Sequence, residues 1–485
     1  MDVGDQPNQP VTVEAVSQYC ARVPALPKAL QARQVVDFGA VPDDDRDDTD
    51  AIQRALDAMQ PGQTLIFAPG RYLISRSLSV RRPGVTILGP NATIHATNPD
   101  DQSLLIQADN TTVASLTFTA VTQDRRTAPR HHRISVIKED STGVHAVYNT
   151  VIRDNRIVNA GEPGSPTANS ASGGGIFLKR ADGFLVSGNT VVRSLADGIH
   201  VTDGSRNGRI LNNIVRETGD DMIAIVSYLG TKNPADNTAS RIIASWSARL
   251  ESSLVRNVLV NGNQVSGQYW GRGISVVGGQ SITISRNTID NVPLAAGILI
   301  AREASWQTFG VENVLVDGNH IHDVQTRRPP YDYKSTFSST SRTGHGAIEV
   351  HAALFEDEAA NSDLREKLAV RNVLLRGNVV DGASVSGVRA GVDQTRTLRK
   401  VDASGEQVQR NSVTGQIRNV GVTNNRFNQT TGEAIRMAST ETGSAAYCGG
   451  NQRDGNTYQP SACKLPAPPA TQGATLNCSS DGKLL

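Results

Sequence analysis

A short strand, a Gly-Asn or Asn-Asn turn and a second short strand recur along this chain of 485 residues. The spacing between turns is 24 residues from Asn189 to Asn213 and again from Asn263 to Asn287. A period in the twenties with short strands is typical of a β-solenoid, in which no coil can bury its apolar face alone. The recurring asparagines are therefore expected to form a structural ladder, each amide bonding the backbone of the next coil: Asn155, Asn189, Asn213, Asn263, Asn287, Asn319, Asn378 and Asn425.

The repeat predicts the fold class and the organisation of the chain. We expect an all-β protein whose parallel strands stack into one long solenoid over residues 34–440, with a leader at 1–33 and a cysteine-containing tail at 441–485. Two longer gaps between repeats predict insertions at Tyr228–Leu254 and Thr326–Arg342. Insertions in solenoids gather on one face and often build the binding cleft.

Composition excludes several partner classes. The formal net charge is only +1, which gives no electrostatic reason to expect nucleic acid or an anionic membrane as a partner. No apolar run of 18 or more residues is present, so no membrane span is expected. The segment after Met1 lacks the basic-then-apolar pattern of a signal peptide. The oligomeric state is left open.

Four cysteines indicate a disulfide framework. Cys448, Cys463 and Cys478 lie in a tail otherwise rich in Gly, Pro, Asn and Ser, and Cys20 lies near the N-terminus. Disulfides would stabilise such a tail, and they persist in oxidising compartments. We therefore expect at least one disulfide and a secreted or periplasmic location. A zinc site built from these cysteines is not expected, because they contain no CxxC pair.

The segment from Val35 to Tyr72 reads as a strand, an acidic turn, a helix over Asp48–Met59 and a Pro-Gly turn between strands. It resembles the N-terminal block of the pectate-lyase superfamily, DxGAxxDGxTDDTxAIQxAI followed by PxGxY. The matching positions are Asp37, Gly39, Ala40, Asp47, Asp48, Thr49, Ala51, Ile52, Gln53, Pro69, Gly70 and Tyr72. The resemblance implies a right-handed parallel β-helix whose first coil this helix caps.

Carboxylates stand at the start of two equivalent strands. Superimposing Asp197-Gly198-Ile199-His200-Val201 on Asp221-Met222-Ile223-Ala224-Ile225 places Asp197 over Asp221, and Asp220 directly precedes Asp221. Parallel strands stacked about 4.8 Å apart would crowd these three carboxylates into one patch. A buried unpaired carboxylate is too costly, so a bend at the start of each strand must turn them outward. Like charges that close raise a pKa, and we expect the raised value at Asp220.

This order of motifs resembles the polygalacturonases, family 28 of the glycoside hydrolases, whose pattern is NTDG, DD, GHG and RIK. The resemblance implies that Asp220 is the general acid and that Asp197 and Asp221 activate a water in an inverting hydrolysis. Arg272 stands in the GHG place instead of His. The RIK place, in Gly297–Ala301, holds neither Arg nor Lys, which puts galacturonan itself in doubt as the substrate.

Five residues around these coils are candidate substrate-binding groups, because they follow or flank the strands that carry the carboxylates: Arg272, His200, Tyr228, Trp270 and Arg302. Trp246 and Trp306 also lie in loops there, and aromatic faces stack on sugar rings. No cofactor and no metal is expected. Glu349, between His345 and His351, is assigned no role, because alternation on one strand explains that pattern equally well.

The sequence thus favours a hydrolase acting on a polysaccharide or oligosaccharide. Two alternatives remain open. A polysaccharide lyase or uronate C5-epimerase on the same fold would use a basic residue beside a carboxylate, and Arg272 fits that role. A non-catalytic, tail-spike-like or adhesin protein that binds glycans is the other. The fold is common to all three and cannot decide between them.

Overall fold

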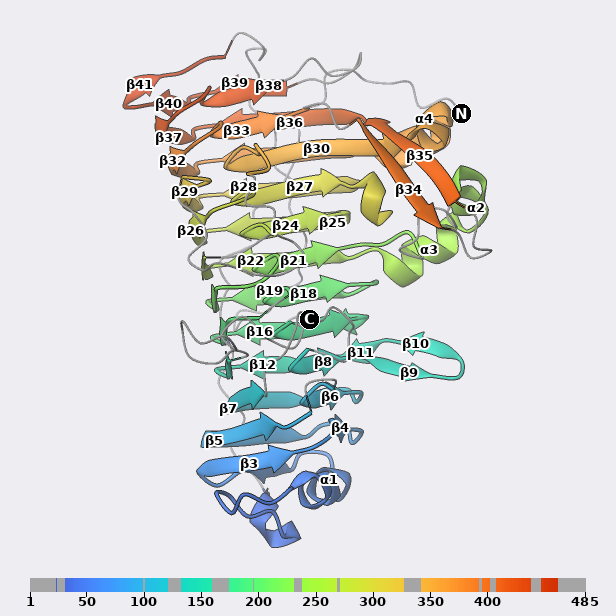
Figure 1. Ribbon diagram of the computed structural model, residues 1–485, viewed down its shortest axis with the longest axis vertical. Coiled ribbons are helices and arrows are strands. Elements are labelled where there is room, and N and C mark those ends of the chain that lie inside the picture. The colour runs from blue at the N-terminus through green and yellow to red at the C-terminus, as the bar shows by residue number, and fades with distance from the viewer. Residues whose placement is uncertain are drawn as a thin grey trace.

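The computed structural model shows one elongated solenoid (Figure 1). The structure describes residues 23, 31–98, 101–120, 132–158, 174–194, 196–230, 238–267, 271–326, 342–391, 395–401, 407–437 and 446–460. Its strands stack coil upon coil in parallel register, with the strands of each sheet contributed by successive coils. The predicted fold class is confirmed.

Two walls of each coil belong to one long sheet, in which the Asn turn separates a first strand from a second. The strands of this sheet are β1 (Ala32–Gln34), β2 (Thr64–Ile66), β3 (Gly70–Ile74), β5 (Thr86–Ala96), β7 (Thr112–Ala120), β11 (Val147–Tyr148), β12 (Val151–Arg153), β13 (Arg156–Val158), β15 (Ala181–Asp182), β16 (Leu185–Ser187), β17 (Thr190–Val192), β19 (Arg206–Leu211), β20 (Ile214–Arg216), β22 (Arg256–Asn261), β23 (Gln264–Ser266), β25 (Gly279–Ser285), β26 (Thr288–Val292), β28 (Val311–Asp317), β29 (His320–Val324), β31 (Val370–Arg376), β32 (Val379–Ala383), β36 (Ile417–Thr423), β37 (Arg426–Thr430), β39 (Ala446–Gly449), β40 (Gln452–Arg453) and β41 (Asn456–Thr457).

The third wall is a second sheet, which we call the site sheet. Its parallel strands are β4 (Leu78–Val80), β6 (Leu104–Ile106), β8 (Ile134–Val136), β14 (Ile176–Lys179), β18 (Ile199–Thr202), β21 (Ile223–Val226), β24 (Ile274–Val277), β27 (Ile298–Arg302), β30 (Ile348–Phe355), β33 (Val388–Ala390) and β38 (Ile435–Met437). The long β30 also pairs with an antiparallel hairpin of β34 (Arg396–Val401) and β35 (Gln407–Thr414), and a separate hairpin joins β9 (Lys138–Asp140) to β10 (Gly143–His145).

Alternation along the site sheet separates a core column from an outward column. The core column is aliphatic and fully buried: Ile176, Ile199, Ile223, Ile274, Ile298 and Ile348. The next residue of each strand has the opposite orientation in a pleated strand, and this outward column is far more varied: Phe177, His200, Ala224, Ser275, Leu299, Glu349 and Arg389. Polar groups on the outer face of this sheet are therefore found in the outward column, at positions of the same parity further along each strand, and in the segments that flank the strands.

The asparagine ladder has the predicted structural role. Asn263 donates from Nδ2 to Asn287 Oδ1 and to the Ile210 carbonyl, both at 2.9 Å, while its own Oδ1 accepts from Asn213. The same pattern runs through all eight predicted positions and extends to Asn451. These side chains are buried, so each rung satisfies backbone groups that water cannot reach.

Asn263→Ala should lower the free energy of unfolding by about 2–4 kcal/mol. The substitution removes both acceptor and donor and leaves partners on Asn213 and Ile210 unsatisfied in the core, at about 1–3 kcal/mol each. The loss of unfolding free energy can be measured by chemical denaturation. Asn261→Ala is the matched control, because that half-buried amide makes one bond to Ser285 and should cost well under half as much. Equal effects would contradict the ladder's structural role.

The solenoid is closed at its start by α1 (Thr49–Asp57), whose N-cap residue is Asp48. At the other end it continues past the predicted boundary at residue 440, because Cys448 and Asn451 take the core and ladder positions of one more coil in β39 and β40. The sequence signal was the dipeptide Gly450-Asn451. Cys448 is not a free thiol, and the other three cysteines lie outside the described residues, so the disulfide framework stays a prediction.

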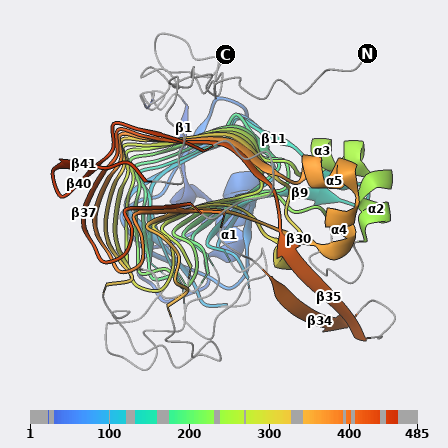
Figure 2. The ribbon, with the colours of Figure 1, turned by 90° about the horizontal axis from the view of Figure 1, so that it is seen from above.

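The first predicted insertion lies on one side of the solenoid, beside the ends of the site-sheet strands, together with two helices that follow β30 (Figure 2). Nearly all of the second predicted insertion, Thr326–Arg342, lies outside the described residues. Helices α2 (Ala239–Ala244) and α3 (Trp246–Ser253) come from the first insertion, and α4 (Glu356–Ala360) and α5 (Ser362–Lys367) follow β30. They share a small apolar core of Leu229, Ile242, Leu254, Phe309, Leu354, Leu364 and Leu368. None of the described helices is long and apolar enough to cross a membrane.

Candidate active site

The three predicted catalytic carboxylates converge just before neighbouring strands of the site sheet. Asp197 precedes β18 and Asp221 precedes β21, and the Gly198 amide donates to the Asp221 carbonyl at 3.0 Å, which sets the two segments one above the other. One oxygen from each of Asp197, Asp220 and Asp221 lies within 4.8 Å of the others. The predicted juxtaposition is therefore present, and such an oxygen set suits either acid–base chemistry or a hard cation such as Ca²⁺.

Asp221 is the most deeply buried of the three. Its Oδ1 accepts from the Arg272 backbone amide at 2.6 Å and from Arg272 Nη1 at 3.4 Å, and its Oδ2 accepts from Ser275 Oγ. Gly271 makes this close packing possible, because a Cβ there would lie 2.3 Å from the Asp221 amide nitrogen and 2.4 Å from Oδ1. Burial raises the Asp221 pKa, Arg272 opposes the rise and the charge of Asp197 adds to it. The sequence expected the raised pKa at Asp220; the structure gives a raised pKa to its more buried neighbour.

His200 lies beside Asp197 in the outward column. Its Nδ1 is 2.6 Å from Asp197 Oδ2, and because an ionised carboxylate only accepts hydrogen bonds, Nδ1 carries the proton. The imidazole is 8% exposed rather than open to solvent, since it packs at 5.2 Å from the ring of Phe177. Phe177 in turn stacks on His132 at 4.6 Å. His200 therefore orients Asp197 and forms part of the wall below the carboxylates.

Arg272 connects the triad to a carboxylate that the sequence reasoning missed. Its guanidinium donates to Glu303, just after β27, as well as to Asp221. Burial lowers the Arg272 pKa, but the charges of Glu303 and Asp221 outweigh it and raise the value. The guanidinium is therefore permanently charged and held between two carboxylates. Only the position of Glu303 beside Arg302, at the end of an equivalent strand, could have signalled this pairing.

The other three predicted binding residues lie in different environments. Tyr228 is half-buried at the end of the β21 segment, where burial and then the charge of Asp197 raise its pKa well above the usual value. Trp270 lies outside the described residues. Arg302 does not reach the site: it is fully buried and pairs with Glu358 at 2.7 Å, so the expectation that it contacts substrate is not met. By register it has the parity of the aliphatic column rather than that of the outward column.

Two further tryptophans divide between surface and packing roles. Trp306 is 50% exposed in the short 3-10 turn η5 (Ala304–Trp306) that follows Glu303, so its ring is available to a ligand near the site. Trp246 packs on Phe309 at 5.4 Å and lies under the Lys367 ammonium, so it serves the helical insertion instead.

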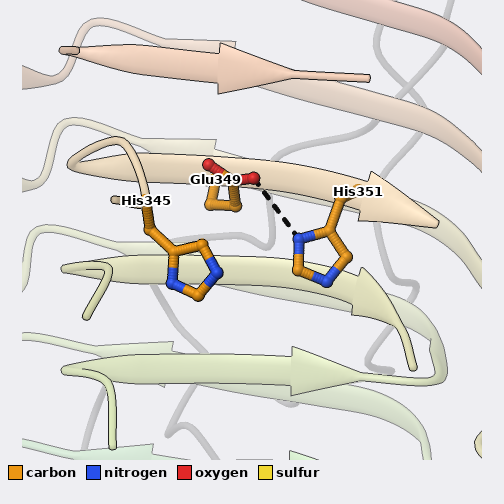
Figure 3. Close-up of side chains that lie close together, drawn as sticks. All are labelled: His345, Glu349 and His351. Atoms are coloured by element: carbon orange, nitrogen blue, oxygen red, sulfur yellow. Dashed lines mark hydrogen bonds and ion pairs between the residues drawn. The ribbon is translucent and has the colours of Figure 1, made fainter. Parts of the chain in front are cut away.

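A second polar cluster lies on and just before β30, two strands beyond β24 in the same sheet (Figure 3). One ligand-type atom from each of His345, Glu349 and His351 lies within 4.8 Å of the others. Arg389 donates to both oxygens of Glu349, at 2.7 and 2.9 Å. Burial raises the Glu349 pKa, but hydrogen bonds from His351 and Arg389 outweigh this effect and lower the pKa to about 2. For His345, burial disfavours the charged imidazolium and lowers the pKa to about 3. The sequence reasoning assigned this cluster no role.

Comparisons with known proteins agree with the fold and with a carbohydrate-active class. The family described as rhamnogalacturonase A/epimerase, pectate lyase-like, matches residues 32–228, and the right-handed β-helix region family matches residues 174–328. No curated protein matches the chain significantly. These matches support the pectate-lyase-like part of the resemblance, whereas its polygalacturonase part stays a hypothesis.

Solved structures similar to this chain include both hydrolases and an epimerase. The catalytic unit of a GH87 α-1,3-glucanase from Streptomyces thermodiastaticus shares 16% identity over 92% of this chain and 73% of that one, with a TM-score of 0.54. A GH87 α-1,3-glucanase catalytic domain in complex with nigerose shares 13% identity over 89% and 66%, with a TM-score of 0.58. The A-module of mannuronan C-5 epimerase AlgE6 from Azotobacter vinelandii shares 16% identity over 88% and 100%, with a TM-score of 0.51. At these identities the likeness shows the fold alone.

Proposed function

We propose that the protein hydrolyses glycosidic bonds of a polysaccharide, with Asp197, Asp220 and Asp221 as its catalytic groups. The observation that carries the proposal is the convergence of three carboxylates beside Arg272, just before the interior strands β18 and β21 of the site sheet. The match to a rhamnogalacturonase-type family and the likeness to glycoside hydrolases with bound sugar support the same class. Export to an extracellular or periplasmic compartment, where such substrates are found, is part of the proposal.

The environments of the carboxylates support distinct roles. Asp220 is partly buried, whereas its neighbour Asp221 is fully buried, so of this adjacent pair Asp220 is the better placed to protonate a leaving oxygen. Asp221 accepts from three donors, which leaves little room for a proton to be donated to substrate, but its raised pKa makes it a better proton acceptor. Together with Asp197 it would hold and deprotonate the attacking water.

The stereochemical course needs its own measurement. The polygalacturonase resemblance implies inversion, for which acid and base are usually about 6.5–9.5 Å apart, whereas separations of about 5–5.5 Å accompany retention. The closest oxygens here lie within 4.8 Å, which is nearer the retaining spacing. A third carboxylate can hold a water in either arrangement, so we keep inversion as the proposal and test it by product configuration.

The charges around the site favour a neutral glycan over galacturonan. Arg272 already pairs with Asp221 and Glu303, and Arg302 is buried against Glu358. Neither is available to grip the carboxylate of a uronate, and the three triad carboxylates would repel one. A neutral polysaccharide needs no cationic partner and is not repelled by the carboxylates.

The lyase or C5-epimerase alternative is weaker by the same observation. Its base would have been Arg272, but two carboxylates raise the pKa of that guanidinium and keep it protonated. The epimerase among the similar structures keeps this reaction as the second candidate, since it has the same fold. A non-catalytic glycan-binding protein is the remaining alternative and is an outcome of the experiment below.

The test is a panel of neutral and uronate polysaccharides in which reducing ends and unsaturated uronides are followed together. We expect new reducing ends from a neutral glycan without unsaturated products, and an inverted anomeric centre by proton NMR at early times. Asp220→Asn protein, expressed and purified in the same way, controls for contaminating hydrolases. Unsaturated uronides, or epimerised residues without cleavage, would establish the second candidate, and glycan binding without turnover would establish a non-catalytic protein.

A further inference from the structure

The cluster of His345, Glu349 and His351 is separate from the triad. It lies on β30 and the residues just before it, two strands beyond the β24 strand that follows Arg272, which corresponds to roughly 10 Å along the axis. In Figure 3 both imidazoles extend from the same side of β30 as Glu349 and flank the space beside its carboxylate. Glu349 is fully buried and His351 is 3% exposed, so the cluster is preorganised by packing.

The tautomer of His345 can be assigned from its partner. Thr343 Oγ1 donates its proton to the Leu294 carbonyl at 3.0 Å. The same hydroxyl is 2.9 Å from His345 Nδ1, and because its proton is already used, it must accept there. His345 Nδ1 therefore carries the hydrogen, and Nε2 keeps a lone pair. A histidine whose second nitrogen is fixed in this way is oriented as metal-ligating histidines are.

The carboxylate is oriented just as firmly. Arg389 donates to both oxygens of Glu349, and the Gly346 amide donates to Oε2 at 3.1 Å. The remaining direction at Oε1 faces His351 Nδ1 at 3.3 Å, which is long for a hydrogen bond between a ring N–H and a carboxylate. Two zinc bonds of about 2.0–2.1 Å at a tetrahedral angle place neighbouring ligand atoms about 3.3 Å apart.

We propose that His345 Nε2, the Glu349 carboxylate and His351 Nδ1 bind one divalent transition-metal ion of the zinc class. Two imidazoles and a carboxylate are the donors that such ions take, whereas Ca²⁺ and Mg²⁺ prefer all-oxygen sites. Binding would displace the Nδ1 proton of His351 to solvent. Thr343, Arg389 and the Gly346 amide then form the outer partners that orient the ligands. Three protein ligands leave one position for water.

Arg389 limits the strength of the site. Its guanidinium balances the Glu349 charge, so an incoming dication gains less than it would from an unpaired carboxylate. We therefore expect an affinity weaker than that of closed structural zinc sites. The proposal does not depend on the proposed hydrolase activity, because metal uptake is measured without any substrate.

The experiment uses the full chain, stripped with a chelator and reloaded with Zn²⁺ or with Co²⁺, whose visible absorption reports its ligands. We expect about one equivalent of ion and a raised melting temperature. His345→Ala and Glu349→Gln should each raise the dissociation constant of the ion by about 100-fold or more. Thr343→Val removes the hydrogen bond that orients His345 and should raise the same dissociation constant by about 10–100-fold. His345 lies in a loop before β30, so its replacement should leave the fold intact by circular dichroism.

Two controls locate the ion. The exposed His320 and the partly buried His322 form an imidazole pair on β29 with ring centres 4.2 Å apart, and replacing both with Ala should leave uptake unchanged. Asp220→Asn tests whether the ion binds at the triad instead, and it too should leave uptake unchanged. The proposal is overturned if the wild-type protein takes up no ion, if His345→Ala retains full uptake, or if only a control variant loses it.

Discussion

Asp220→Asn should reduce the hydrolysis rate on the true substrate by about 10²–10⁴-fold while leaving substrate binding largely intact. The change removes one proton-transfer group, and general acid–base catalysis contributes about that factor per group. The side chain is only partly buried, so an isosteric amide should not disturb the fold. Initial rates of reducing-end formation and the affinity of the variant for the same glycan would be measured together.

A matched control and a contrary outcome make this result decisive. Asp290, a partly exposed carboxylate on β26 of the other sheet, can be changed to Asn and should keep normal activity. Near-normal activity in Asp220→Asn together with complete loss in Arg272→Ala would contradict the acid assignment. That pair of results would favour the lyase or epimerase reaction instead.

Glu358→Ala should lower the free energy of unfolding by about 3–5 kcal/mol, the cost of leaving a buried charge without its partner. Both Arg302 and Glu358 are fully buried, and their side chains meet at 2.7 Å. Arg302 also donates to the Thr308 carbonyl at 3.2 Å, so the pair fixes the turn that carries Glu303 and Trp306. Chemical denaturation measures the loss.

Two further variants isolate the pair. Glu356→Ala, an exposed change on the same helix α4, should have little effect. Replacing the pair together, as Arg302→Met with Glu358→Leu, should be closer to neutral than either single change, because apolar residues avoid the desolvation cost. If Glu358→Ala lowered the free energy of unfolding as little as Glu356→Ala, the buried ion pair would not be what holds α4 against the solenoid.

The regular part of the fold was predictable because its causes are local and periodic. The Asn turn and the aliphatic column repeat in sequence, so the solenoid, the ladder and the alignment of Asp197 with Asp221 follow from spacing alone. Alternation fails just before the strands, where Asp197 and Asp221 have the parity of the core isoleucines yet turn outward. It would have succeeded for Arg302, whose parity differs from that of the outward column and which the structure buries.

The partners of the site residues were not predictable, because they either join non-equivalent positions of neighbouring coils, as Arg272 and Glu303 do, or lie on either side of an insertion, as Glu349 and Arg389 do. Glu303 meets Arg272 across 31 residues, and Arg389 meets Glu349 across 40. A fixed period cannot place such pairs. Likewise, the tautomer of His345 depends on what Thr343 and Leu294 do in three dimensions.

The asparagine ladder also gives the solenoid a direction. In each rung one hydrogen of Nδ2 donates to the Oδ1 of the next asparagine toward the C-terminus, while the other returns to a backbone carbonyl of the preceding coil. The amide-to-amide bonds therefore run in one direction from Asn155 to Asn451. Aligned hydrogen bonds polarise one another, so a rung gains strength from the rungs on both sides. An interior rung such as Asn263 should therefore hold its neighbours in place more strongly than a terminal one. The molecule should thus resist separation of its coils most at mid-length and open first from its ends.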